Sequence, residues 1–231
     1  MSEETPTGKH LYRLMAWLSP SYPVGAFSYS GGLELAVESG DVGDAETLQG
    51  WLRVIISDGG GFCDAVLFAH THRAARSCDD EALIAVAELA AALSPSRERH
   101  LETSAQGQAF IDVTRAAWPC DALDRLLAIW TGPYAYPVAV ATAAAGHGIG
   151  VSAALPAYLH ALAANLVSAG VRLIPLGQTD GQRILARLEP VIGATVARAM
   201  ATPRDDIGGA AFRADLASLR HETQYTRLFR S

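Results

Sequence analysis

Two histidines two residues apart are the first place where this sequence offers ligands for a metal ion. His70 and His72 are expected on a helix, where a step of two residues turns the side chains about 200° apart, onto opposite faces. Histidines that chelate a metal from one helix lie four residues apart, and His221-Glu222 lacks such a second histidine. Cys63 shares a face with His70 only loosely, and a buried thiol is the simpler interpretation. The sequence therefore predicts no metal site.

Motifs for nucleophilic and nucleotide chemistry are missing as well. Ser28 and Ser30 have glycines at the wrong offsets for the nucleophile elbow of a hydrolase. The triple glycine at 59–61 is followed by Phe-Cys-Asp, which lacks the lysine and hydroxyl that hold a triphosphate. His147, between two glycines, is either a point of close backbone approach or a hydrogen-bonded core residue. We predict no catalytic residue, no cofactor and no enzyme activity, and the residues favour a binding or scaffold role.

Charge and composition restrict the partners. Eighteen Lys and Arg against 24 Asp and Glu give a net charge of -6, without the basic excess that nucleic acid requires. Half of the 231 residues are apolar, which indicates that partners or a second copy cover part of the surface. Cys63, Cys78 and Cys120 are odd in number and far apart, as in a cytoplasmic protein with reduced thiols. The polar residues 1–10 do not resemble a signal peptide and are expected to form a flexible tail.

Helices are expected to position nearly all of these residues. Apolar side chains recur at steps of three and four, and sustained alternation is absent. Aspartates at 44, 64, 79 or 80, and 121 are expected to cap helices, with acidic residues otherwise on exposed faces and no close pair in an apolar setting. We predict an all-α, single-domain bundle of roughly nine or ten helices over residues 11–224. The expected helices cover 11–18, 33–38, 45–58, 65–77, 81–93, 97–118, 122–130, two segments around a hinge at 146–148, then 184–196 and a last helix from 212.

An uncharged run occupies the centre of the chain. No Asp, Glu, Lys or Arg occurs between Arg125 and Arg172. Gly and Pro interrupt this run repeatedly and its many alanines are weakly apolar, so we expect a buried core and no membrane span. Arg172, the first charge after the run, is expected to contribute little to packing. It precedes a polar elbow that is a candidate functional region, and the alternative is a core helix that simply ends at Pro175.

Three motifs taken together resemble the urease accessory protein UreF family. They are SPSYPVGAFSYSGGLE at 19–34, VRLIPLGQTDGQ at 171–182 and HETQYTRLFRS at 221–231. They occur in the order and spacing of the family, and the resemblance covers residues 11–231. The polar helix that begins with Arg97, Glu98 and Arg99 and contains Gly107 is similar to the central region of the family.

The resemblance implies an all-helical protein that forms a homodimer and has no chemistry of its own. Members of the family bind the accessory protein UreD, also called UreH. That complex recruits the GTPase UreG, so that nickel can be delivered to the urease apoprotein. On this interpretation the nucleotide site belongs to UreG, and the partners and a second copy cover the apolar surface.

The resemblance also indicates candidate site residues. The basic residue 172 is implied to contact UreG through its charge more readily than as an arginine finger. The two glutamines after it are implied to hydrogen-bond across the elbow or to line a polar path. The first motif is implied to form a turn that leads into a helix, or alternatively a turn that only orders the N-terminal region. The candidates are Pro23, Gly25, Ser28 and Glu34 in the first motif, and Arg172, Gln178, Gln182, His221, Glu222, Tyr225, Arg227, Leu228, Phe229 and Arg230 in the other two.

Residues 225–231 are expected to form a partner-binding tail. Burial of Tyr225, Leu228 and Phe229 contributes roughly 5–8 kcal/mol at most. Ordering seven residues costs about 1–2 kcal/mol each. These terms nearly cancel, so we expect the tail to be mobile in the free chain and to become ordered on UreD/UreH, where Arg227 and Arg230 add hydrogen bonds.

A second class of function stays open, namely a helical metal-carrying protein or an enzyme with an unrecognised site. Turnover or stable, stoichiometric nickel in the purified chain alone supports that class. Loss of urease activation while apo-urease stays folded supports the accessory protein.

Overall fold

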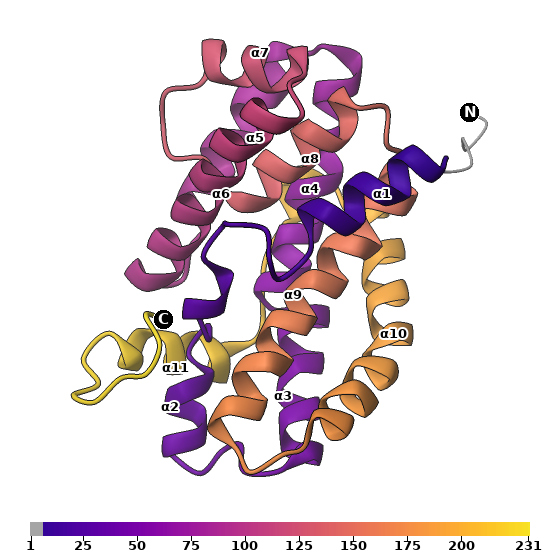
Figure 1. Cartoon of the computed structure of the whole chain (residues 1–231). Helices are drawn as coiled ribbons and strands as arrows, with labels where there is room; N and C mark the ends of the chain where they lie inside the picture. The colour runs from indigo at the N-terminus through magenta and orange to yellow at the C-terminus, as the bar shows by residue number, and fades with distance from the viewer. Residues whose placement is uncertain (1–6) are drawn as a thin grey trace.

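The computed structural model describes residues 7–231, and over these residues the chain is a single all-α unit without strands (Figure 1). The predicted fold class is confirmed, with eleven α-helices in the described part of the chain where roughly nine or ten were expected. The elements are α1 (Gly8–Trp17), the 3-10 segment η1 (Ala26–Ser28), α2 (Leu33–Glu38), α3 (Ala45–Asp58), α4 (Gly60–Ser77), α5 (Asp80–Ala92), α6 (Arg97–Ala117), α7 (Asp121–Ile129), α8 (Tyr136–Gly146), α9 (Val151–Leu173), α10 (Gln178–Ala201), the 3-10 segment η2 (Arg204–Asp206) and α11 (Phe212–His221).

The uncharged run forms the centre of the molecule as α8 and α9. Residues 137–144 of α8 are all buried, and this helix packs against α4 and α6. In Figure 1 α9 runs through the middle of the bundle, and it packs against α10, α4 and α8. The turn between Gly146 and Val151 separates the two helices, so the expected hinge is confirmed. An almost uncharged sequence is suited to this place, because buried charges are costly unless they are paired.

Of the described helices, α9 alone is long and apolar enough to cross a membrane. Half of its most apolar window is buried against other helices. This is the arrangement of a helix in the core of the bundle, as expected for the uncharged run.

Several helix starts follow the expected caps, and two do not. Asp44 and Asp79 accept hydrogen bonds from the backbone amides of Thr47 and Ala82. The expectation that Asp64 caps a helix is wrong, because α4 begins at Gly60, directly after α3. At the second differing start, that of α7, Cys120 takes the N-cap position and Asp121 is the first helical residue.

Close helix packing explains why the triple glycine does not end α3 in a loop. A Cβ at Gly61 would lie 2.9 Å from the Cα of Ile56, and one at Gly59 would lie 2.7 Å from the Cβ of Ala211. The glycines therefore let α3, α4 and the segment before α11 approach one another. This approach carries Asp64 into the interior of the molecule.

Two further boundaries differ from those predicted from the sequence, namely the start of α1 and the start of α10. Helix α1 begins at Gly8 with Thr7 as its N-cap, so residues 8–10 are its first turn and not a flexible tail. Residues 1–6 lie outside the described residues. The elbow after α9 is confined to 174–177, and Gln178 is already the first residue of α10.

Candidate functional site

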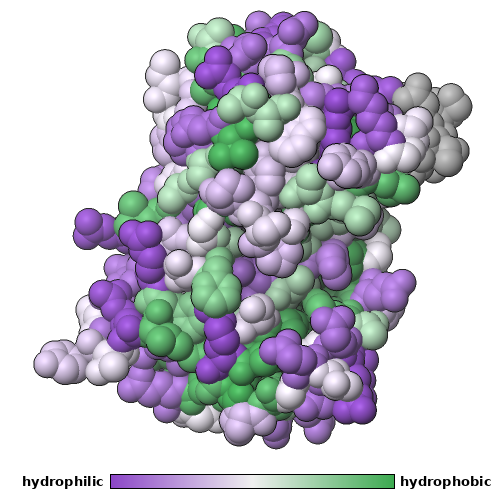
Figure 2. Space-filling model, viewed as in Figure 1, coloured by the Kyte–Doolittle hydropathy of each residue, from purple (hydrophilic) through white to green (hydrophobic). Residues whose placement is uncertain are grey.

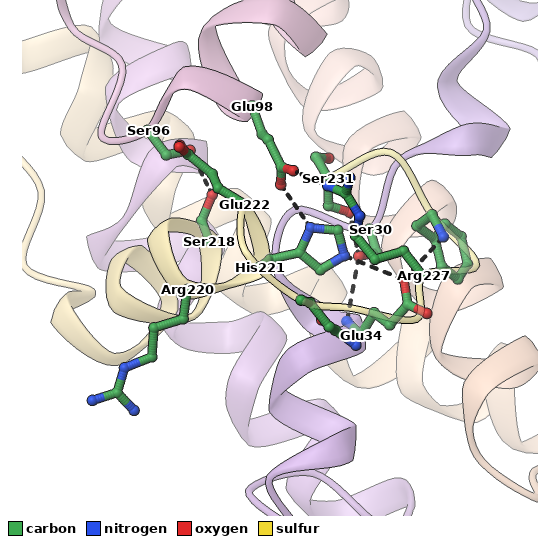
Figure 3. A network of polar contacts seen from close by, with 12 residues as sticks. Ser30, Glu34, Ser96, Glu98, Ser218, Arg220, His221, Glu222, Arg227 and Ser231 are labelled. Carbon is green, nitrogen blue, oxygen red and sulfur yellow. Dashed lines mark hydrogen bonds and ion pairs between the residues drawn. The ribbon is translucent and has the colours of Figure 1, made fainter.

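The three sequence motifs meet in one region of the structure. The first motif supplies η1 and the first two residues of α2, the second supplies Arg172 at the end of α9, and the third folds back from α11 over both (Figures 1 and 3). The residues of this meeting point come from parts of the chain up to 201 residues apart. We call residues 227–231 the tail, and Glu34, Glu98, His221, Arg227 and Ser231 the tail network.

Glycines in the first motif bring α2 against α11. Gly31 and Gly32 have φ values of +62° and +82°, which L side chains rarely adopt. A Cβ at Gly32 would lie 2.6 Å from the backbone nitrogen of Ser218 in α11. This close approach places His221, at the end of α11, beside Glu34.

His221 joins α2 and α6. Its side chain is buried, with Nδ1 2.6 Å from Oε2 of Glu98 and Nε2 3.2 Å from Oε2 of Glu34 (Figure 3). Arg227 donates from Nη1 to Oε1 of Glu98 at 2.7 Å. The expectation that acidic residues outside the helix caps lie on exposed faces is therefore wrong for Glu34 and Glu98, which are buried and share one histidine.

Glu34 holds the tail through its backbone. The amides of Leu228 and Phe229 donate to its two carboxylate oxygens at 2.6 and 2.9 Å. These hydrogen bonds involve a charged acceptor and are stronger than neutral ones. Glu34 is thus the anchor that fixes the direction of the tail.

The far end of the tail pairs with the loop before α2. The amide of Ser30 donates to the carbonyl of Ser231 at 2.8 Å, and the amide of Arg230 donates to the carbonyl of Ser28 at 2.8 Å. Ser231 and Phe229 are buried. The expectation of a tail that is mobile in the free chain is therefore wrong, because it counted apolar burial alone and left out these hydrogen bonds to the folded domain.

Arg172 lies between the first motif and the tail. Its guanidinium carbon is 3.6 Å from the ring centroid of Phe27 and 4.4 Å from that of Phe229, and Nη2 donates to the carbonyl of Phe27 at 3.0 Å. The expectation that this residue contributes little to packing is wrong, because the planar guanidinium stacks on aromatic rings.

A second polar group, which we call the buried acidic cluster, lies deeper in the bundle. It consists of Asp64, Arg99, Glu102 and Tyr158. Arg99 donates to Glu102 at 2.5 Å and the Tyr158 hydroxyl donates to Asp64 at 2.9 Å. Burial raises the pKa of the Asp64 carboxyl to about 6, against the lowering effects of Arg99 and the Tyr158 hydrogen bond. The Ser231 hydroxyl donates to Glu102 at 2.8 Å, so the tail and this cluster are in contact.

Two cavities of about 290 and 300 Å³ adjoin the buried acidic cluster. Both are lined by Asp64, Arg99, Thr103 and Leu162, so the cluster forms part of the wall of each. Gln182 of the second motif lines the larger cavity. A polar path lined by Gln182 stays a prediction, and this cavity is the part of the fold where such a path would lie.

Several candidate residues lie away from the tail network. Gln178 and Gln182 are exposed on α10, and Pro23 and Gly25 are exposed in the turn before η1. Gly25 has a φ of +76°, as the expected tight turn requires. At the start of the third motif, Glu222 accepts a hydrogen bond from the amide of Arg97 at 2.8 Å.

The histidines considered as metal ligands bind backbone carbonyls. His70 lies 2.9 Å from the carbonyl of Thr202, and His72 lies 2.8 Å from that of Ile149. His147 contacts Arg13 and the carbonyl of Trp118, as expected of a hydrogen-bonded core residue. Over residues 7–231 no group of three or more His, Cys, Asp or Glu side chains is placed to hold a metal ion.

Sequence reasoning missed much of α6 as part of the site. Glu98, Glu102 and Gln106 recur at a step of four and are all buried. A polar stripe of this kind on a helix is usually solvated, and nothing in the sequence shows that α11 and the tail cover it. Ser30 and Ser231 were missed because their pairing spans almost the whole chain.

Comparisons with known proteins agree on one family. The sequence model of the UreF family matches residues 42–189. The urease accessory protein UreF of Rhodopseudomonas palustris strain BisB18 is 62% identical over 221 residues, which cover 96% of this chain and 92% of that protein. The protein of the same name from strain HaA2 is 60% identical over 224 residues, covering 97% and 94%. That of Bradyrhizobium sp. strain BTAi1 is 61% identical over 221 residues, covering 96% and 92%.

Proposed function

Because this chain belongs to the UreF family and is an accessory protein, not an enzyme, we propose that it assembles a urease maturation complex. In this role it binds UreD/UreH as a cytoplasmic homodimer, and the complex recruits the GTPase UreG. Nickel is the cargo that this complex delivers to the urease apoprotein.

The single observation that carries the proposal is the division of the third motif into an inner and an outer side. Phe229 is buried against Arg172, whereas Tyr225 is fully exposed and Leu228 is 69% exposed. Large apolar side chains held outward on an anchored segment are typical of a protein interface. The network holds the tail in shape, and the outer side chains are then available to UreD/UreH.

Further exposed apolar residues support additional interfaces. Figure 2 shows hydrophobic residues on this face in separate groups among polar ones, the broadest in its lower half. Exposed apolar residues on α1 and on α11 recur at helical spacing, so each helix presents one apolar face. Each face could contact a partner or a second copy of the chain. These residues are Leu11, Tyr12 and Met15 on α1, and Phe212, Leu216 and Leu219 on α11.

The outer side of the third motif can be tested by co-purification with UreD/UreH. We expect Tyr225→Ala combined with Leu228→Ala to lose this partner, because both side chains supply exposed contact area. The free energy of unfolding should stay within about 0.5 kcal/mol of the native value, because neither side chain is buried. The matched control is Leu101→Ala, which removes an exposed apolar side chain from α6, outside the proposed interfaces, and should leave the pull-down unchanged. Retention of UreD/UreH by the double variant would exclude the outer side as the contact.

The alternative of a metal-carrying protein or an enzyme predicts a different result. We expect calorimetry on the isolated chain to give no sub-micromolar site for Ni²⁺ or GTP, since neither a phosphate-binding loop nor helical metal-ligand spacing is present in the sequence. A tight site for either one, or turnover by the chain alone, would favour the alternative.

A further inference from the structure

The smaller of the two cavities beside the buried acidic cluster can be reached from solvent. Its volume of about 290 Å³ is roughly ten times the share of one water molecule in the liquid. Exposed residues form its rim at the end of α5, in the connection to α6 and in the segment before α11. They are Ala92, Pro95 and Gly209. A small molecule can therefore enter at this rim without the opening of a helix.

Two carboxyl groups from different helices face this cavity. Asp64 comes from α4 and Asp215 from α11. Both act on the thiol of Cys63, since burial and the two carboxyls together raise the pKa of that thiol to about 12. The two acidic groups therefore lie near the same point of the wall. The thiol beside them stays neutral and adds no charge.

Neither carboxyl has a cation of its own. Burial raises the pKa of Asp215 against the lowering effect of Arg99, and the pKa of Asp64 is raised in the same way. Arg99 is the one cation among the described residues that line the cavity, and its guanidinium already donates to Glu102 at 2.5 Å. When both aspartates are ionised, the wall carries an excess of negative charge, which is costly unless a cation compensates it.

The rest of the wall is mostly apolar. Large aliphatic side chains come from α3, α4, α9 and the end of α5, and they can pack against an alkyl chain. In the described part of the chain no group of three or more His, Cys, Asp or Glu side chains is placed to hold a metal ion. An acidic end and apolar walls together fit an organic cation. The aliphatic residues are Ile55, Leu67, Leu93, Leu162 and Leu166.

We propose that this cavity binds an alkylammonium group, with the ammonium between Asp64 and Asp215 and the alkyl chain along the aliphatic wall. An ammonium carries three N–H donors and no acceptor, so it can donate to both carboxylates and compensate their charge. A small aliphatic amine and a lysine side chain share this chemistry. The site belongs to the isolated chain, and its test does not depend on the partners of the proposed function.

Amide NMR of the full chain, titrated with n-butylammonium chloride at about pH 7.5, tests the site, because the amine is charged at this pH. We expect saturable shifts of the amides of Cys63, Asp64 and Asp215, with a dissociation constant of about 1 mM or below, as for a small ligand that is largely buried. n-Butanol has the same chain without the charge and should bind at least about tenfold more weakly.

A second probe separates the two sources of the ammonium. Nα-Acetyl-lysine methylamide carries the same group on a peptide backbone. If it shifts the same amides, the rim admits the lysine side chain of a protein. If n-butylammonium alone does so, the ligand is a free amine. Either result supports the alkylammonium site.

Asparagine variants test the two carboxylates. We expect Asp64→Asn and Asp215→Asn each to weaken the binding of n-butylammonium about tenfold or more, since each removes one charged acceptor. Asp205→Asn, at an exposed position of η2, is the matched control and should bind as the native chain does. If one of the two cavity variants does not fold, the other decides.

The pH dependence of binding distinguishes this site from a general attraction to an acidic protein. The charged groups at the cavity are Asp64 of α4, Asp215 of α11 and the Arg99–Glu102 pair of α6. A carboxyl with a pKa of about 6 is only about one tenth ionised at about pH 5, so binding should weaken about tenfold between pH 7.5 and pH 5. This loss should be smaller in Asp64→Asn. The absence of saturable shifts, equal binding of n-butanol, or native binding in both cavity variants would overturn the proposal.

Discussion

At the level of single residues, the carboxyl of Asp64 shows how burial and charge oppose each other. Its pKa rises from the ordinary 3.8 to about 6 because burial disfavours the ionised form more than Arg99 and Tyr158 favour it. Between these two values the unfolded chain is ionised while the folded chain still holds the proton. The free energy of unfolding therefore falls as the pH rises from about 4 to about 6.

Asp64→Asn should remove this pH dependence. The amide stays neutral and its oxygen still accepts from the Tyr158 hydroxyl. We expect the variant to be roughly 2–3 kcal/mol more stable than the native chain at about pH 7.5, with the difference shrinking toward about pH 4.5. Urea denaturation at the two pH values measures it. Asp205→Asn, whose carboxylate is 90% exposed, is the control, and an equal gain in both variants would contradict the assignment to burial.

The position of Arg172 predicts that its planar guanidinium, and not its charge alone, stabilises the fold. We expect Arg172→Ala to lower the free energy of unfolding by about 1–2 kcal/mol, from the lost stacking on Phe27 and Phe229 and the lost hydrogen bond. Arg172→Lys keeps the charge but not the planar group and should recover only part of this. Urea denaturation provides the measurement, with Arg183→Ala, an exposed cation on α10, as the variant expected to stay within about 0.5 kcal/mol.

At the level of elements, two helical glycines can be compared, one where a helix is closely packed and one on an open helix surface. Gly107 in α6 faces the segment before α8, and a Cβ there would lie 1.9 Å from the carbonyl oxygen of Tyr134. Gly193 in α10 has nothing within 4 Å of the same position. The two residues have similar places in their helices and opposite surroundings.

Substitution by alanine should therefore have opposite effects at these two glycines. We expect Gly107→Ala to destabilise the fold by about 3 kcal/mol, because α6 must move away from Tyr134. Gly193→Ala should stabilise it by about 0.5–1 kcal/mol, because alanine is the better helix former. Thermal unfolding compares them, and a loss of stability in Gly193→Ala would show that a contact has been missed.

The elements were largely predictable because helical periodicity and caps such as Asp44 and Asp79 are local. The triple glycine at 59–61 was misjudged because its role depends on which helices approach it. The site was harder for the same reason. His221 and Glu34 were recognised from the resemblance, whereas the buried stripe of α6 looks like a solvated face until α11 covers it.

At the level of the whole molecule, the third motif is a structural part of the domain, and in the proposed function it is also the outer contact surface. Removal of residues 225–231 takes away the buried Phe229 and leaves Glu34 without its backbone donors. We expect this deletion to lower the free energy of unfolding by about 3 kcal/mol, close to the cost of truncating a buried phenylalanine. Helix content should not change, because α11 ends at His221. Circular dichroism gives both quantities, and an unchanged melting temperature would contradict a packed tail.

The pairing of Ser30 with Ser231 also sets an order in time. A ribosome adds about 5–20 residues per second, so roughly 10–40 s pass between the synthesis of these two serines. Throughout that interval α2 has no tail to pair with, and Glu98, once α6 has been made, still lacks its contacts with His221 and Arg227. A nascent chain therefore completes this region last, and a chain interrupted before residue 227 differs from a finished one at the same surface that the proposed partner must recognise.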